Sequence, residues 1–251
     1  LHKKKQVMVF VFCFIPFFFG FLIPVARLIS WMLRSDVVIH GYNLFGTALN
    51  TLFVSFASSI SIVLIASLVI FTKNYFNNDA IKKVTGLAIL GYSMPGAIIA
   101  IGVLKLNGII DEYIPLLFVG TIGGLVFSYI VRFLAVAWQP IESSVEKLGA
   151  NVSQASRILN VNSSKSFLYI YLPILKKPIL IACLIVFIDI SKELPLTLIL
   201  RPFNFDTLAT LTYDLVSQAQ FFQSSVPSLF IILISMPAIL IINRQVIKGS
   251  K

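Results

Sequence analysis

Six stretches of the sequence are almost continuously apolar, and short polar segments separate them. They cover residues 7–26, 51–71, 84–104, 114–137, 178–200 and 226–242. A helix needs about 20 apolar residues to cross the hydrocarbon core of a bilayer, and each stretch reaches or approaches that length. The pattern predicts an all-α, polytopic membrane helix bundle with about six transmembrane helices, forming a single transmembrane domain over residues 1–251.

Composition excludes a water-soluble globule. Of the 251 residues, 58% are hydrophobic and 12% are charged, whereas a soluble domain carries roughly 25% charged residues. Both cysteines, Cys13 and Cys183, lie in apolar stretches, so neither a disulfide framework nor a zinc site is expected. The first stretch is longer than the apolar part of a signal peptide and has no small-residue cleavage site, which favours a retained span.

The distribution of Lys and Arg predicts the orientation in the membrane. The net charge of +10 is spread over short clusters between the apolar stretches, a pattern typical of membrane topology rather than nucleic-acid binding. If the amino terminus is cytoplasmic, 14 basic residues lie on the cytoplasmic side and four on the other side. This bias predicts that both termini are cytoplasmic.

The longest polar segment, residues 139–177, is predicted to be a cytoplasmic loop with structure of its own. Four apolar residues recur at helical spacing and predict a helix over residues 143–159: Val145, Leu148, Val152 and Ala155. Asn160 would end that helix in a left-handed turn, and Ser163 or Ser164 could cap a second helix over residues 165–172. Such a bent pair could enter a groove on a cytoplasmic partner. The alternative is an interfacial hairpin without a partner.

Two spans carry features that interrupt an ordinary apolar helix. Residues 91–96 (GYSMPG) include Pro95, which predicts a kink or a break in the third span. Tyr92, Ser93 and Pro95 are therefore candidate residues of a translocation path. The fifth span contains Asp189, Lys192 and Glu193 at spacings that place them on one helical face. Ionisable groups at that depth should face the bundle or water. Either a translocation path or simple helix packing would explain each feature, and packing is the preferred explanation for Gly120-x-x-x-Gly124.

An external segment, residues 201–222, follows the fifth span. Three leucines at helical spacing predict a short helix after residue 206: Leu208, Leu211 and Leu215. Asn204 or Asp206 could cap it. That helix would either receive a partner or cover the bundle.

The chemistry of an enzyme is not visible in the sequence. A phosphate-binding loop needs a Lys after its second Gly, but Gly91 is followed by Tyr92. There is no HExxH motif, and no nucleophile has a nearby His. We therefore expect no ATPase site and no bound cofactor in this chain.

The loop and the segments beside it resemble the permease subunits of ATP-binding-cassette (ABC) importers, which have a MetI-like helical architecture. The loop motif of that family, EAA, three residues, Gly, then about a dozen residues to Leu-Pro, is matched in spacing, with Gln and Asn in the Glu and Gly positions. The matching residues are Gln154, Ala155, Ser156, Asn160, Leu172 and Pro173. Residues 192–195 (KELP), 201–209 (RPFNFDTLA), 91–96 and 132–135 (RFLA) are similar to the ferric iron branch.

The resemblance implies a channel subunit of an ATP-driven importer in the bacterial inner membrane. Its partners would be a cytoplasmic ATPase dimer docked on residues 139–177, an extracytoplasmic solute-binding protein and a second permease half, fused or separate. This chain is similar to the second half of a fused pair, which would explain why it starts at Leu1. Ferric iron is the implied substrate, and thiamine, polyamines or phosphonates are alternatives. From other functional classes, an ion-coupled secondary transporter using Asp189 and Glu193, or a membrane scaffold without transport, stays open.

Overall fold

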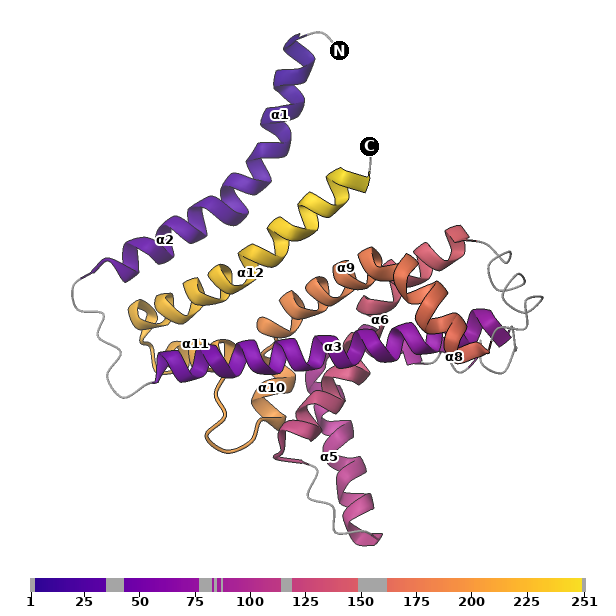
Figure 1. Cartoon of the computed structure of the whole chain (residues 1–251). Helices are drawn as coiled ribbons and strands as arrows, with labels where there is room; N and C mark the ends of the chain where they lie inside the picture. The colour runs from indigo at the N-terminus through magenta and orange to yellow at the C-terminus, as the bar shows by residue number, and fades with distance from the viewer. Residues whose placement is uncertain are drawn as a thin grey trace.

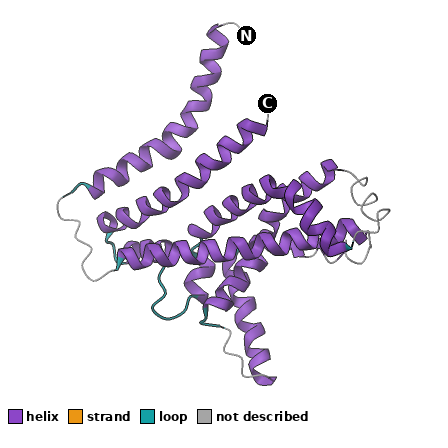
Figure 2. Ribbon diagram, in the orientation of Figure 1, coloured by secondary structure: helices purple, strands orange, loops and turns teal. Residues whose placement is uncertain are grey.

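The computed structural model describes residues 3–34, 43–76, 83, 85–86, 88–113, 119–148 and 162–249, and every regular element within these ranges is a helix. The elements, in chain order, are α1 (Lys3–Phe17), η1 (Phe18–Leu22), α2 (Ile23–Met32), α3 (Leu44–Phe76), η2 (Ile89–Ser93), α5 (Gly96–Tyr113), α6 (Ile122–Leu148), α8 (Ser163–Ser166), η3 (Phe167–Tyr171), α9 (Leu172–Ser191), α10 (Pro195–Leu200), α11 (Leu208–Ser217) and α12 (Phe221–Gly249). Figures 1 and 2 show this all-helical bundle, and the predicted fold class is confirmed.

Five helical stretches are long and apolar enough to cross a membrane. They are Lys5–Met32, Leu44–Tyr75, Ile122–Lys147, Ser163–Ser191 and Phe221–Gln245, which correspond to the first, second, fourth, fifth and sixth predicted spans. The third predicted span is interrupted, as Pro95 predicted. η2 ends at Ser93, Met94 has extended backbone (φ −87°, ψ 138°), and α5 begins at Gly96. Within the described ranges, the break is followed by a shorter apolar helix, Gly96–Ile110.

The bounds predicted for the fifth span, residues 178–200, are wrong at both ends. The helix already begins at Ser163, because α8, η3 and α9 are continuous, and it ends at Ser191. Asn162 precedes it without a side-chain capping bond, so the caps predicted at Ser163 or Ser164 are not made. The separate helix over residues 165–172 is therefore the first part of the span.

Two π-helical turns occur where helices continue into prolines. η1 precedes Pro24 and η3 precedes Pro173. In each case the residue before the proline donates its backbone N–H five residues back, from Ile23 to Phe18 and from Leu172 to Phe167. Proline removes a donor and its ring crowds the preceding turn. The wider π turn accommodates that crowding, so the helix continues.

Two further predictions concern α6 and its ends. α6 runs through to Leu148, so residues 143–148 extend the fourth span and are not the start of a separate helix. Residues 149–161, with Val152 and Ala155 of the predicted stripe, lie outside the described residues. Gly120 lies in a turn with a φ of +76° before α6 begins. Gly120 and Gly124 therefore do not share a helix face, and the predicted packing motif is wrong.

The core lies where α3, α6 and α9 pack together. Large side chains of α6, such as Tyr129 and Trp138, are buried there against small or branched residues of α3 and α9, such as Ala66 and Ala182. Among the buried serines on α3, Ser67 donates its hydroxyl to the Val63 carbonyl oxygen at 2.7 Å, whereas the hydroxyls of Ser55 and Ser58 make no hydrogen bond within the described part of the chain. Small residues at helix contacts allow the close approach on which membrane bundles depend.

The outside of the bundle is apolar over long stretches, as hydrocarbon surroundings require. α1 extends away from the other helices in Figure 1, and large apolar side chains along it, including Met8 and Phe12, are exposed. A patch this extensive would be a liability in water. The surface therefore supports the membrane location that composition predicted.

The predicted external helix is present as α11, and its leucine stripe faces inward. Leu208, Leu211 and Leu215 are all buried, and α11 packs mainly on α12. The cap is Thr207, whose hydroxyl accepts from the Thr210 N–H while its own N–H donates to the Thr210 hydroxyl. The caps predicted at Asn204 or Asp206 are therefore wrong, and the stripe covers the bundle.

Candidate functional site

Two interrupted spans meet beside the middle of α6. One break lies between η2 and α5 at Met94 and Pro95. The other lies between α9 and α10, where Lys192 ends one helix and Pro195 begins the next. Proline is well tolerated in the first turn of a helix, because the backbone N–H groups there have no partner within the helix. At the two breaks, backbone groups and polar side chains are not used in regular helix hydrogen bonding and packing.

An ion pair joins α6 to the second break. Arg132 Nη1 lies 3.2 Å from Glu193 Oε1, and the two side chains are only 19% and 7% exposed. The same carboxylate oxygen accepts from the Leu196 backbone N–H at 3.2 Å, which caps the first turn of α10. Glu193 thus holds α10 and α6 together, and breaking the pair would leave a buried charge uncompensated.

Glycine is required where the first break approaches this pair. A Cβ at Gly96 would lie 1.7 Å from Arg132 Nη1 and 2.8 Å from Glu193 Oε1. A Cβ at Gly91 would lie 2.0 Å from the Val131 carbonyl oxygen of α6. Side chains at these positions cannot fit without movement, so both glycines bring the interrupted third span against α6.

A polar pocket of about 590 Å³ lies between the two breaks. Its lining consists of Tyr92, Ser93, Met94, Pro95, Arg132, Phe133, Asp189, Lys192 and Glu193. All six residues predicted for a translocation path are among them, although they come from segments about 100 residues apart. Their role in translocation stays a prediction.

Arg132 and Phe133 were not predicted as site residues. The signal for Arg132 was present in the sequence, because an Arg within an apolar span is costly unless it faces a polar interior. Its guanidinium carbon lies 5.4 Å from the centroid of the Phe133 ring. Arg132 Nε is buried and makes no hydrogen bond within the described part of the chain, which leaves this donor available to a polar solute.

The pocket contains balanced charge. Besides the Arg132–Glu193 pair, Lys192 Nζ lies 3.0 Å from Asp189 Oδ1, and Lys192 is the more exposed partner. The lining can therefore offer carboxylate oxygens to a cation or cationic groups to an anion as the pairs open. Within the described residues, no group of three or more His, Cys, Asp or Glu side chains is placed to hold a metal ion.

The residues predicted to couple to an ATPase are only partly described. Gln154, Ala155, Ser156 and Asn160 lie outside the described residues. Leu172 and Pro173 lie at the start of α9, and Pro173 is exposed. The coupling role of all six stays a prediction.

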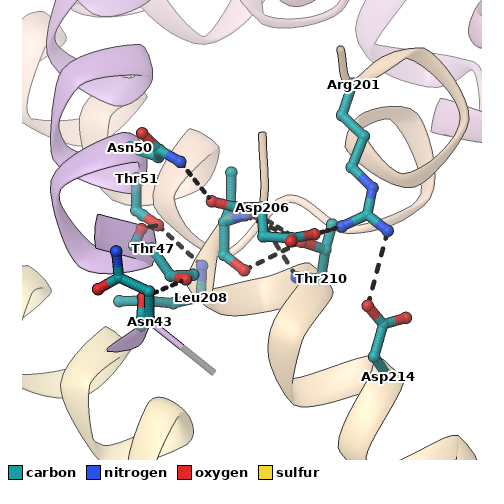
Figure 3. Close-up of polar contacts among 10 residues, drawn as sticks. Asn43, Thr47, Asn50, Thr51, Arg201, Asp206, Leu208, Thr210 and Asp214 are labelled. Carbon is teal, nitrogen blue, oxygen red and sulfur yellow. Dashed lines mark hydrogen bonds and ion pairs between the residues drawn. The ribbon is translucent and has the colours of Figure 1, made fainter. Parts of the chain in front are cut away.

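The segment from Arg201 to Leu208 is tied to the start of α3. Figure 3 shows Arg201 between Asp206 and Asp214, forming an ion pair with each. Asn50 donates to the Asp206 carbonyl oxygen at 3.1 Å, and the Leu208 N–H donates to Thr51 Oγ1 at 2.8 Å. At the opposite end of α3, Phe71 packs on Tyr171, with ring centroids 5.0 Å apart. Residues 201–208 and η3 therefore lie at opposite ends of the bundle.

The chain is similar to known transport proteins. No protein-family model matches it. It is 21% identical over 252 residues to the Fe(3+)-transport system permease protein FbpB 2 of Haemophilus influenzae, covering 99% of this chain and 49% of the relative. The chain thus spans about half the length of that curated relative.

Two solved structures share the fold. One is a bacterial alginate ABC transporter in complex with an alginate pentasaccharide-bound periplasmic protein, which gives a TM-score of 0.75 at 14% identity over 99% of this chain and 94% of that one. The other is a bacterial ABC transporter that imports alginate, with a TM-score of 0.71 at 15% identity over 99% and 98%. The curated relative is a permease protein of a transport system, in agreement with the expectation that this chain is a transport subunit. The chain therefore has the fold of ABC importer permeases and resembles, over nearly its whole length, the permease of a ferric iron transport system.

Proposed function

We propose that this chain is a transmembrane permease subunit of an ATP-driven ABC importer, and that the pocket between its two interrupted spans is part of the translocation path. The observation that carries the proposal is this pocket, lined by Arg132, Asp189, Lys192 and Glu193 inside an otherwise apolar bundle. Ionisable groups at membrane depth are costly and are kept where transport needs them. Interrupted helices are tolerated at that depth where they line a cavity.

Ferric iron is the proposed substrate. The resemblance to a ferric iron permease supports it, and the Asp189 and Glu193 carboxylates are hard oxygen ligands suited to Fe³⁺. In this proposal Fe³⁺ is cargo that passes the pocket, so transient opening of the two ion pairs would expose the carboxylates. Thiamine, polyamines and phosphonates are the competing substrates.

The proposed partners lie at the two ends of the bundle. Residues 139–177 would contact a cytoplasmic ATPase dimer, and residues 201–222 would face an extracytoplasmic solute-binding protein. A second permease half, fused or separate, would complete the path in the bacterial inner membrane, with both termini of this chain cytoplasmic. The placement of α8 and α11 at opposite ends of α3 supports this division of contacts.

Uptake by reconstituted vesicles tests the proposal. The chain is expressed with its neighbouring gene products, the proteins that co-purify are identified by mass spectrometry, and the complex is placed in proteoliposomes with binding protein and radioactive Fe³⁺ outside. We expect uptake that requires ATP inside and survives collapse of the proton gradient. Uptake that persists without the ATPase and stops with the gradient would instead favour an ion-coupled secondary transporter.

The role of the pocket needs its own variants in the same assay. Asp189→Asn should lower Fe³⁺ uptake about tenfold or more, because the pocket loses one of its two carboxylates. Asp189→Glu keeps the carboxylate and should retain most of the uptake. Equal uptake by all three proteins would remove Asp189 from the path.

A further inference from the structure

Phe203 lies in the segment that joins α10 to α11, and its side chain is fully exposed within the described part of the chain. It is 101% exposed, whereas Phe205, two residues further on, packs against the core. The connecting loop extends away from the helices in Figure 1 and is drawn as a teal loop in Figure 2. One short turn thus holds one aromatic ring inside the bundle and presents another outside it.

The turn that presents Phe203 is tightly held. Arg201 forms ion pairs with Asp206 and Asp214, and Asn50 of α3 hydrogen-bonds the Asp206 carbonyl oxygen, as Figure 3 shows. Within the turn, the Phe205 N–H donates to the Pro202 carbonyl oxygen at 3.2 Å.

Local backbone conformation adds to this constraint. Asn204 has a φ of 59°, in the left-handed region that Asn tolerates better than most residues. Proline at position 202 fixes its own φ. A side chain on so constrained a turn loses little further freedom when a partner covers it, and such preorganisation favours binding.

The neighbours of Phe203 indicate a protein partner rather than lipid tails. Arg201, Asp206 and Asp214 are each partly exposed within a few residues of the ring or in contact with its turn. Placing charged groups of this kind in hydrocarbon costs free energy, so this part of the chain is expected to face water. The excess of Lys and Arg at the other end of the bundle assigns this end to the extracytoplasmic side.

We infer that Phe203 is an anchor residue for the extracytoplasmic solute-binding protein and inserts into an apolar pocket on that protein. The inference rests on the proposed function, from which the partner follows, and it names Phe203 as the residue of this chain that the partner binds. Large aromatic side chains dominate the energy of many protein interfaces, and truncating such an anchor commonly weakens binding tenfold or more.

The test measures ATP hydrolysis by the whole complex in lipid nanodiscs as Fe³⁺-loaded binding protein, encoded with this chain, is added. Phe203→Ala should raise the half-saturating concentration of binding protein at least tenfold while the maximal rate stays within twofold. Phe203→Tyr keeps the ring and should stay within about threefold of the wild type. Phe45→Ala is the matched control, because Phe45 is an aromatic residue 74% exposed at the start of α3, close to the same end but outside the turn; it should leave the half-saturating concentration unchanged.

Three results would overturn the inference, and they are distinguishable. If binding protein stimulates the wild-type complex and Phe203→Ala leaves the half-saturating concentration unchanged, Phe203 is not an anchor, although the proposed function stands. A change only in the dependence on nanodisc lipid composition would likewise assign the ring to the membrane surface. If binding protein fails to stimulate the wild type at any concentration, the proposed function fails and the inference falls with it.

Discussion

Lys73 and Glu142 form an ion pair that joins the end of α3 to α6, across 69 residues of chain. The Trp138 indole N–H donates to the second oxygen of Glu142, and Lys73 Nζ lies 5.5 Å from the centroid of the Trp138 ring. The three side chains fasten α6 to α3 about two turns before α6 ends at Leu148. Any force that reaches the bundle from the segment after α6 is therefore passed to α3 as well.

The cluster of Lys73, Trp138 and Glu142 should matter more for the coupling of ATP hydrolysis to transport than for the stability of the fold. Lys73→Glu places two carboxylates together and should lower substrate-stimulated ATP hydrolysis by the assembled complex several-fold. The change in the free energy of unfolding should be only about 1 kcal/mol, since both partners are partly exposed. The double variant Lys73→Glu with Glu142→Lys restores opposite charges and should recover stimulated hydrolysis. A double variant as impaired as the single one would assign the effect to local damage and not to the pair.

The Arg132–Glu193 pair should behave as a buried interaction. Arg132→Ala leaves Glu193 buried without its partner, and we expect a loss of about 3–5 kcal/mol in the free energy of unfolding in detergent. Adding Glu193→Gln removes the uncompensated charge and should recover part of that loss. A double-mutant cycle with no coupling between the two substitutions would show that the pair contributes nothing to stability.

Part of this site was predictable because placing an ionisable group in hydrocarbon is costly, so such groups face the protein interior or water. Asp189, Lys192 and Glu193 were expected to face the bundle or water, and Pro95 was expected to kink or break its span, which the extended backbone at Met94 confirms. Their meeting in one pocket depends on contacts between helices that the sequence does not show. Arg132 carried the same signal in the sequence, but its partner was not evident because it lies 61 residues away on another helix.

Other features depended on contacts that one sequence does not reveal. The π turns that carry helices into Pro24 and Pro173 have no residue signature of their own. The fifth span was therefore predicted to begin at residue 178, although its helix begins at Ser163. The cap of α11 was predicted one to three residues early, since Asn204 and Asp206 are both good capping residues. Thr207 caps the helix instead, while Asp206 forms an ion pair with Arg201.

Gly96 should be intolerant of any side chain. Gly96→Ala would place Cβ against the Arg132 guanidinium and separate it from Glu193. We expect a loss of about 1–3 kcal/mol in the free energy of unfolding, as in overpacked cores, together with reduced Fe³⁺ uptake. Gly102→Ala is the matched control, because nothing lies within 4 Å of a Cβ at Gly102 in the same helix α5. That variant should be neutral or slightly stabilising, since Ala favours helix over Gly by up to about 1 kcal/mol.

The Asn in the Gly position of the loop motif provides a last test, at a residue outside the described ranges. Asn160 is predicted to make a left-handed turn, which costs a β-branched residue about 1–2 kcal/mol more. Asn160→Val should therefore lower substrate-stimulated ATP hydrolysis while basal hydrolysis by the ATPase persists. Asn162→Val is the matched control, because Asn162 has a φ of −56° and a ψ of 142° and makes no capping bond to α8. Valine readily adopts such an extended backbone conformation. If both variants keep full stimulation, the left-handed turn is absent at Asn160; if both lose it equally, the loop is sensitive to apolar substitution in general and the turn is not the cause.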